Sequence, residues 1–127
     1  MAQTILIVDD EPDIRATIEI RLTANGYQVI TAEDGEEGLK KIQENAIDLA
    51  IIDIYMPKMD GYAFYKELKK DKKTASIPIL VLSARSQLEG PFRAVGADSF
   101  LAKPFEAEDL LGQVARLLSR PASTPRF

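Results

Sequence analysis

Five side chains that could do chemistry follow short runs of apolar residues in this chain. They belong to Asp9, Asp10, Asp53, Ser83 and Lys103. If the apolar runs are parallel strands of one sheet, these side chains meet at the carboxyl edge, where open α/β sheets bind ligands. Three carboxylates beside one ammonium leave negative charge uncompensated, and a divalent cation that prefers oxygen ligands would balance it. The arrangement therefore predicts a Mg²⁺ site.

Asp53 could also act as a nucleophile. An aspartate carboxylate can accept a phosphoryl group as an acyl phosphate, and this transfer depends on charge neutralisation and positioning more than on covalent machinery. Mg²⁺ and Lys103 would supply positive charge, the Ser83 hydroxyl could donate a hydrogen bond to a phosphoryl oxygen, and the backbone carbonyl of Tyr55 could be a further metal ligand. Each residue alone is more often structural or solvated, so the ordered set at four strand ends carries the prediction.

Composition excludes several other kinds of protein. A chain of 127 residues is the size of one domain, and its net charge of -4 argues against direct nucleic-acid binding. No apolar run approaches the roughly 18 residues of a membrane span, and a strand follows Met1 so closely that no secretory signal is expected. The absence of cysteine and histidine excludes thiol chemistry, Ser-His-Asp catalysis and histidine-ligated zinc. A cytoplasmic location is expected.

Strand-like and helix-like segments alternate along the chain. Apolar or alternating runs predict five strands, at residues 4–8, 27–32, 48–52, 77–82 and 99–102. Amphipathic periodicity and capping residues predict helices from Pro12 to Gly26, from Asp34 to Asn45, after a turn at 57–61, and over 106–118. Such alternation requires helices on both faces of the sheet, which makes the fold α/β.

The sequence predicts the structure of two further segments less clearly. The segment 84–97 should hold a further helix, but Gly90 and Pro91 interrupt it. The polar run Lys69–Lys73 is interpreted as the solvated end of the third helix, and a functional basic patch is the alternative interpretation.

Several motifs resemble the receiver domain of two-component response regulators, over roughly residues 4–118. The matching segments are Ile7–Glu11, Asp53 with Met56–Gly61, Leu82–Ala84, Gly96–Asp98 and Lys103–Phe105. The resemblance implies a flavodoxin-like (βα)5 fold, in which a five-stranded parallel sheet of order 2-1-3-4-5 carries helices on both faces. It implies one receiver domain at residues 1–119, followed by a tail or the start of a linker at 120–127.

The resemblance also assigns roles to the acidic residues. Asp9, Asp10 and Asp53 would hold Mg²⁺ together with the backbone carbonyl of Tyr55. Asp53 would accept a phosphoryl group from a partner histidine kinase or histidine phosphotransfer protein. The chain is thus predicted to be a signalling phosphoacceptor that promotes only its own phosphorylation and dephosphorylation, not a metabolic enzyme.

A conformational switch is part of the same resemblance. Ser83 and Lys103 would contact the phosphoryl group, and a cis peptide bond would join Lys103 to Pro104. Phosphorylation would draw Ser83 inward and let Phe100 rotate into the vacated space, as a two-state element biased by a local charge. An ordinary core position for Phe100 is the simpler interpretation of that residue.

The role in the cell stays open between several alternatives. A single-domain regulator would act on an unknown downstream protein, with phosphorylation-dependent dimerisation as one outcome. The chain could also be a receiver module of a longer regulator, or a pseudo-receiver scaffold that is not phosphorylated. An aspartyl-phosphate phosphatase is disfavoured, because such enzymes place two aspartates two residues apart after the first strand, whereas Asp9 and Asp10 are adjacent.

Overall fold

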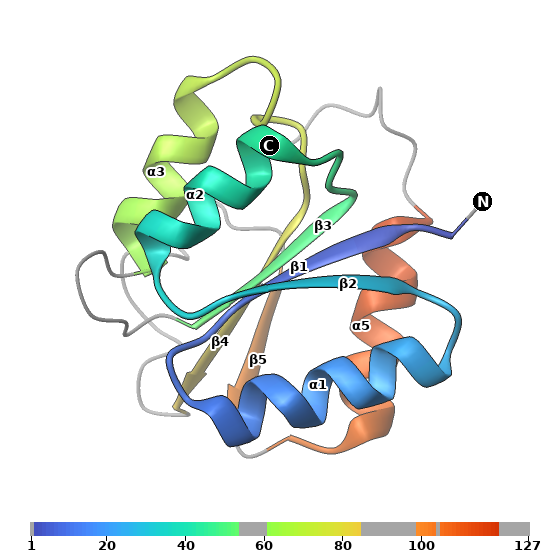
Figure 1. Cartoon of the computed structure of the whole chain (residues 1–127). Coiled ribbons are helices and arrows are strands. Elements are labelled where there is room, and N and C mark those ends of the chain that lie inside the picture. Colours follow the sequence, from blue (N-terminus) through green and yellow to red (C-terminus); the bar gives the residue numbers. More distant parts are fainter. Residues whose placement is uncertain (1, 54–60, 85–98, 104, 120–127) are drawn as a thin grey trace.

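The chain forms a parallel β-sheet between two layers of helices (Figure 1). The computed structural model describes residues 2–53, 61–84, 99–103 and 105–119. Its strands are β1 (Thr4–Val8), β2 (Gln28–Ala32), β3 (Leu49–Asp53), β4 (Ile79–Ala84) and β5 (Ser99–Lys103). Its helices are α1 (Pro12–Ala24), α2 (Gly35–Glu44), α3 (Gly61–Lys70) and α5 (Ala107–Leu118). No helix in these ranges is long and apolar enough to cross a membrane.

The strand order is β2-β1-β3-β4-β5, and every pairing is parallel, which confirms the predicted fold class. The fourth strand begins at Ile79 rather than at the predicted Ile77. The Ile77 amide instead donates to the Thr74 carbonyl in a turn, and Pro78 has no N–H to offer the sheet. The predicted turn at 57–60, the segment 85–98 and the tail 120–127 lie outside the described residues.

The central strands are apolar throughout because both of their faces are buried. In β1, Leu6 and Val8 contribute to the core beneath α2 and α3, whereas Ile5 and Ile7 contribute to the core beneath α1 and α5. Figure 1 shows these two helix pairs on opposite sides of the sheet. Side chains that alternate along a strand point to opposite faces, so one short run serves both cores.

Local signals fix the helix boundaries that the sequence predicts. Pro12 occupies the first turn of α1, and Gly26 follows that helix with a φ of 90°, which an L side chain rarely adopts. At the start of α2, the Asp34 carboxylate accepts a hydrogen bond from the Glu37 amide at 2.8 Å. These signals set the end of α1 and the start of α2 on either side of β2.

Gly38 allows α2 to lie close to the sheet and to α3. A Cβ atom at this position would lie 2.9 Å from Phe64 Cε2 and 2.9 Å from Val8 Cγ2, both in the core. Gly112 in α5 has nothing within 4 Å of an added Cβ atom. The two helical glycines therefore form a matched pair for testing this contact.

We predict that Gly38→Ala lowers the free energy of unfolding by roughly 1–2 kcal/mol, because overpacking outweighs the gain in helix propensity. Gly112→Ala should raise it by about 0.5–1 kcal/mol, because only the propensity changes. Urea denaturation followed by circular dichroism measures both. Equal effects of the two substitutions would show that α2 can shift away from the sheet without cost.

Candidate functional site

The strand register brings three of the chemically active positions to one edge of the sheet. Val8, the last residue of β1, pairs with Ile52, so Asp9 and Asp53 extend from adjacent strands. Across β4, Asp53 pairs with Leu82, and Ala84 pairs with Lys103 of β5. The convergence that the sequence predicts is therefore present for Asp9, Asp53 and Lys103.

Lys103 is the centre of this arrangement. Its Nζ donates to Asp53 Oδ2 at 3.0 Å, to Glu11 Oε1 at 3.2 Å and to Asp9 Oδ2 at 3.5 Å. The Lys103 side chain is 18% exposed, the Asp53 side chain is 8% exposed and the Asp9 side chain is fully buried. Partial exclusion of water strengthens these ion pairs relative to surface pairs. One ammonium thus joins the carboxylate that ends β3 to two carboxylates of the loop after β1.

Asp9 is held by its own loop as well as by Lys103. Its Oδ1 accepts a hydrogen bond from the Glu11 amide at 2.9 Å, and its carbonyl accepts one from Arg15 Nη1 at 2.7 Å. Its amide donates to the Ala32 carbonyl of β2. These contacts fix the carboxylate at the edge of the sheet although burial disfavours its charge.

The pKa values reflect a site with surplus negative charge. Burial raises the pKa of Asp9 from 3.8 to about 6, against the opposing effects of the Glu11 amide and the Lys103 ammonium. For Lys103, burial acts to lower the pKa, but the hydrogen bond and charge of Asp53 and the charge of Asp9 together raise it above its usual value. Lys103 therefore stays charged, and its single charge does not neutralise the cluster.

The remaining carboxylates suit a small, hard cation. Asp9, Asp10, Glu11 and Asp53 each offer one oxygen, and these four oxygens lie within 4.8 Å of one another. Oxygen ligands on opposite sides of one Mg²⁺ lie about 4 Å apart. The donor set is all oxygen, and because burial raises the pKa of Asp9, a bound cation would offset the cost of its buried charge. These residues fit a Mg²⁺ ion.

The other predicted positions are only partly described. The Ser83 backbone pairs with Ala102, one residue beyond the row in which Leu82 pairs with Asp53. Phe100 is half-buried and packs against the core beneath α2 and α3, as the simpler interpretation expected. Tyr55 and Pro104 lie outside the described residues, so the carbonyl ligand and the cis peptide stay predictions.

Sequence reasoning missed two contributors. Glu11 lies within the first matching motif, but the sequence assigned it no role. Its carboxylate contacts Lys103 and belongs to the acidic cluster. Arg15, one turn into α1, anchors the Asp9 carbonyl. A third consecutive acid was a visible signal for Glu11, whereas nothing in the local sequence distinguishes Arg15 from a solvated helical arginine.

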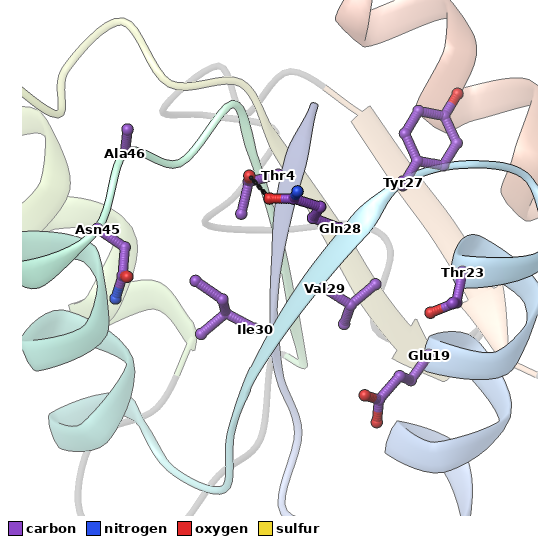
Figure 2. Close-up of a pocket in the computed structure, with 9 residues that line it drawn as sticks. All are labelled: Thr4, Glu19, Thr23, Tyr27, Gln28, Val29, Ile30, Asn45 and Ala46. Carbon is purple, nitrogen blue, oxygen red and sulfur yellow. Dashed lines mark hydrogen bonds between the residues drawn. The ribbon is translucent and has the colours of Figure 1, made fainter. Parts of the chain in front are cut away.

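A separate hollow lies at the opposite edge of the sheet, beside the first residues of β1 and β2. Figure 2 shows Thr4 and Gln28 there, joined by a 3.3 Å hydrogen bond between their side chains. Among the residues that line it, Glu19 alone carries a charge. The hollow therefore lacks the convergent charges of the acidic edge, which we take as the candidate functional site.

Sequence comparison agrees with the fold and with the geometry of this edge. The chain matches the response regulator receiver domain over residues 5–115 and belongs to that family. Its matching region contains every residue of the acidic cluster and Lys103. The resemblance predicted from the motifs is thereby confirmed.

Individual relatives are similar over most of this chain. The DNA-binding dual master transcriptional regulator RpaA of Synechocystis sp. is 38% identical over 124 residues, which are 96% of this chain and 52% of that protein. The solved chemotaxis response regulator CheY4 of Vibrio cholerae is 37% identical, with a TM-score of 0.84 over 92% of this chain and 99% of its own.

A third relative was solved with ligands. The response regulator protein TrrA from Thermotoga maritima, in complex with Mg²⁺-BeF, is 38% identical, with a TM-score of 0.82 over 91% of this chain and 98% of its own. The chain spans about half the length of the curated relatives it matches.

We predict that Asp9→Asn stabilises the metal-free protein at pH 7 by roughly 1–3 kcal/mol, because it removes a buried charge. The folded state raises the pKa of Asp9 to about 6. Proton binding to Asp9 therefore stabilises the folded state fully below about pH 4, and this stabilisation is lost as the pH rises through 6. The advantage of the variant should shrink as the pH falls from 7 to 4, as measured by urea denaturation in chelator.

The matched control is Asp13→Asn, at an exposed position in the first turn of α1. This substitution should have little effect on stability, with no such pH dependence. A stability difference for Asp9→Asn that is constant from pH 4 to 7 would contradict the role of the buried charge.

Proposed function

We propose that this receiver domain is a Mg²⁺-dependent phosphoacceptor in which Asp53 carries the phosphoryl group. The observation that carries the proposal is the 3.0 Å contact of Lys103 Nζ with Asp53 Oδ2 inside a cluster of carboxylates. Asp53 ends a buried strand, and its side chain keeps 8% exposure at the edge of the sheet. It is therefore held in place at the edge where a phosphoryl donor would approach.

The transfer is an exchange of one bond for another. An oxygen of the Asp53 carboxylate attacks the phosphorus of a phosphohistidine on a histidine kinase or histidine phosphotransfer protein. The O–P bond forms as the P–N bond breaks, and the electron pair of that bond stays on the imidazole nitrogen. The ring leaves as neutral imidazole because its other nitrogen already carries a proton.

The charges in this site would support that step. Lys103 lies close enough to the Asp53 carboxylate to bind the phosphoryl oxygens after the transfer. Asp9, Asp10 and Asp53 are the carboxylates that would hold Mg²⁺, and the Tyr55 carbonyl would complete the protein ligands. The ion supplies positive charge to the phosphoryl oxygens. Glu11 competes for Lys103, and we assign it the role of holding the ammonium when no phosphoryl group is present.

A switch would follow from the same contacts. When Lys103 and Ser83 bind the phosphoryl oxygens, the end of β4 is drawn toward Asp53, and Phe100 can occupy a more buried position. Phe100 is already half-buried against the core beneath α2 and α3. Its side chain has no polar group, so further burial leaves no hydrogen bond unsatisfied.

The output of the switch is a separate question. The domain would act on a downstream protein, either as a single-domain regulator or as the receiver of a longer one, and phosphorylation-dependent dimerisation is one form this could take. RpaA binds DNA as a protein about twice the length of this chain. Because the chain itself has a net charge of -4, we do not extend DNA binding to this domain.

We predict that incubation with acetyl phosphate and Mg²⁺ adds the mass of one phosphoryl group to the wild-type protein. Asp53→Asn should abolish the adduct, because an amide oxygen is too weak a nucleophile, whereas Asp13→Asn should keep it. Chelation of Mg²⁺ should also prevent it. Intact mass spectrometry measures all four samples. An adduct that persists in Asp53→Asn would show another acceptor, and no adduct in any sample would support the scaffold alternative.

We predict opposite effects of Lys103→Gln on metal binding and on phosphorylation. Mg²⁺ affinity should rise by roughly threefold to tenfold, because the ammonium no longer competes for Asp9 and Asp53. Phosphorylation should slow by at least about tenfold, because the phosphoryl charge loses its partner. Calorimetric titration and the mass assay measure the two effects.

The control for this pair of measurements is Lys70→Gln. The Lys70 side chain is 70% exposed and pairs with Glu67 at 3.1 Å on the surface of α3. Its substitution should change neither quantity. A parallel loss of both Mg²⁺ binding and phosphorylation in Lys103→Gln would instead show that Lys103 only holds the site together.

A further inference from the structure

A groove lies between α2 and the end of α3, beside a lysine-rich segment. Residues 66–73 hold five lysines and two acids, in a chain whose net charge is -4. The groove has a volume of about 640 Å³. The residues that line it include two leucines, Leu39 and Leu68. Three of the five lysines line the groove together with both acids, so what needs an explanation is the role of its lysines rather than a strong net charge.

Two lysines of this segment already have structural roles. Lys69 donates to the Ala75 carbonyl at 2.9 Å and lies over the Tyr65 ring, 5.2 Å from its centroid. Lys70 pairs with Glu67 at 3.1 Å. Lysines near a helix C-terminus also complement the helix dipole. Structural roles therefore account for Lys69 and Lys70.

Lys72 and Lys73 are different. Both are exposed, and neither side chain makes a hydrogen bond or ion pair with another described residue. They sit on a turn rather than on the helix, beyond the last residue of α3. Adjacent ammonium groups repel one another, and no contact of this pair with a described residue offsets that repulsion.

The turn that presents these two lysines is firmly held. Thr74 is buried, and its Oγ1 donates to the Leu68 carbonyl at 2.6 Å. The Asp71 carboxylate accepts from the Lys73 amide at 2.9 Å, and the Asp71 carbonyl accepts from the Ala75 amide at 2.8 Å. A ligand would therefore meet ammonium groups on an ordered backbone, which lowers the entropic cost of binding.

Apolar side chains line the same groove. Leu68 of α3 is only 1% exposed, whereas Leu39 of α2 is half-buried and packs against the same core, so Leu39 is the leucine that a ligand could contact. A surface that pairs an apolar base with basic rims is complementary to a segment with apolar anchors and flanking carboxylates. Two acids, Glu67 and Asp71, also line the groove and would oppose a continuous polyanion such as a nucleic acid.

The groove lies away from the phosphoacceptor edge. Helices of a parallel α/β sheet run opposite to the strands, so the end of α3 lies at the amino edge, where β4 begins (Figure 1). A partner bound there would leave Asp53 and Lys103 accessible. The groove is thus a second surface, independent of the proposed phosphoryl chemistry.

We propose that this groove between α2 and α3 docks an acidic peptide segment of a partner protein, with leucine-like side chains in the groove and carboxylates on Lys72 and Lys73. The interpretation of residues 69–73 as only a solvated helix end then applies to Lys69 and Lys70, and the basic-patch alternative applies to the turn. The proposal does not depend on phosphorylation of Asp53.

The test uses fluorescence anisotropy with a short labelled peptide in which glutamates flank two leucines spaced one helical turn apart. We expect binding that weakens with added NaCl. The double variant Lys72→Glu/Lys73→Glu should bind at least roughly tenfold more weakly. The double variant Arg21→Glu/Arg116→Glu makes the same change in net charge on exposed residues of α1 and α5, and should bind within about twofold of wild type.

Two further probes separate the groove from simple attraction of charge. A peptide with serines in place of the leucines should bind at least roughly tenfold more weakly than the leucine peptide. An oligothymidine of matched length should bind more weakly than the leucine peptide. The circular dichroism spectrum and the midpoint of urea unfolding should be close to those of the wild type in both double variants, which shows that they are folded.

Three results would overturn the proposal. Equal loss in the two double variants would mean that only net charge matters. Equal binding of the serine peptide would mean that the groove contributes nothing. Tighter binding of the oligothymidine, with the same dependence on Lys72 and Lys73, would identify a nucleic-acid surface instead.

Discussion

The contacts of Lys103 with Asp53, Asp9 and Glu11 are the interaction on which the functional edge of this protein depends. Carboxylates this close repel one another, and a fully buried Asp9 would be costly without a compensating charge. Lys103 supplies part of that charge from the last residue of β5. Burial still raises the pKa of Asp9 to about 6 against the effect of Lys103, so the site is held together yet remains short of positive charge. A site in that condition is prepared to bind a cation.

The apolar packing on both faces of the sheet offsets the cost of gathering these charges at its edge. Every strand of the central part is buried on both faces, and the two cores beneath the helix pairs hold most of the large side chains. Parallel pairing aligns the strand ends without help from the site itself. Stabilisation therefore comes from the apolar faces, and the polar edge is free to carry an arrangement that opposes folding. Close approach of α2 at Gly38 belongs to the same tight packing.

Much of this could be predicted from the sequence because the signals were local. Asp9 follows β1 and Asp53 ends β3, and apolar runs of this kind have few other interpretations. Glu11 was missed because its role depends on the reach of Lys103, whose position in the chain is 92 residues away. The start of β4 was placed too early because Ile77 is apolar, whereas its hydrogen bond belongs to a turn. The burial that raises the pKa of Asp9 likewise arises only from tertiary packing.

Charge is separated along the axis of the strands, and the helices contribute to that separation. Four acids gather at the carboxyl edge of the sheet, beside the first turn of α1, where a helix dipole favours negative charge. Lysines gather at the last turn of α3 and just beyond it, where the dipole favours positive charge. The dipole accounts for Lys69 and Lys70 within the helix, but its effect falls off within one turn. Lys72 and Lys73 lie beyond that range on a turn fixed by Thr74 and Asp71, so the positive charge at this end of the molecule exceeds what the helix itself requires.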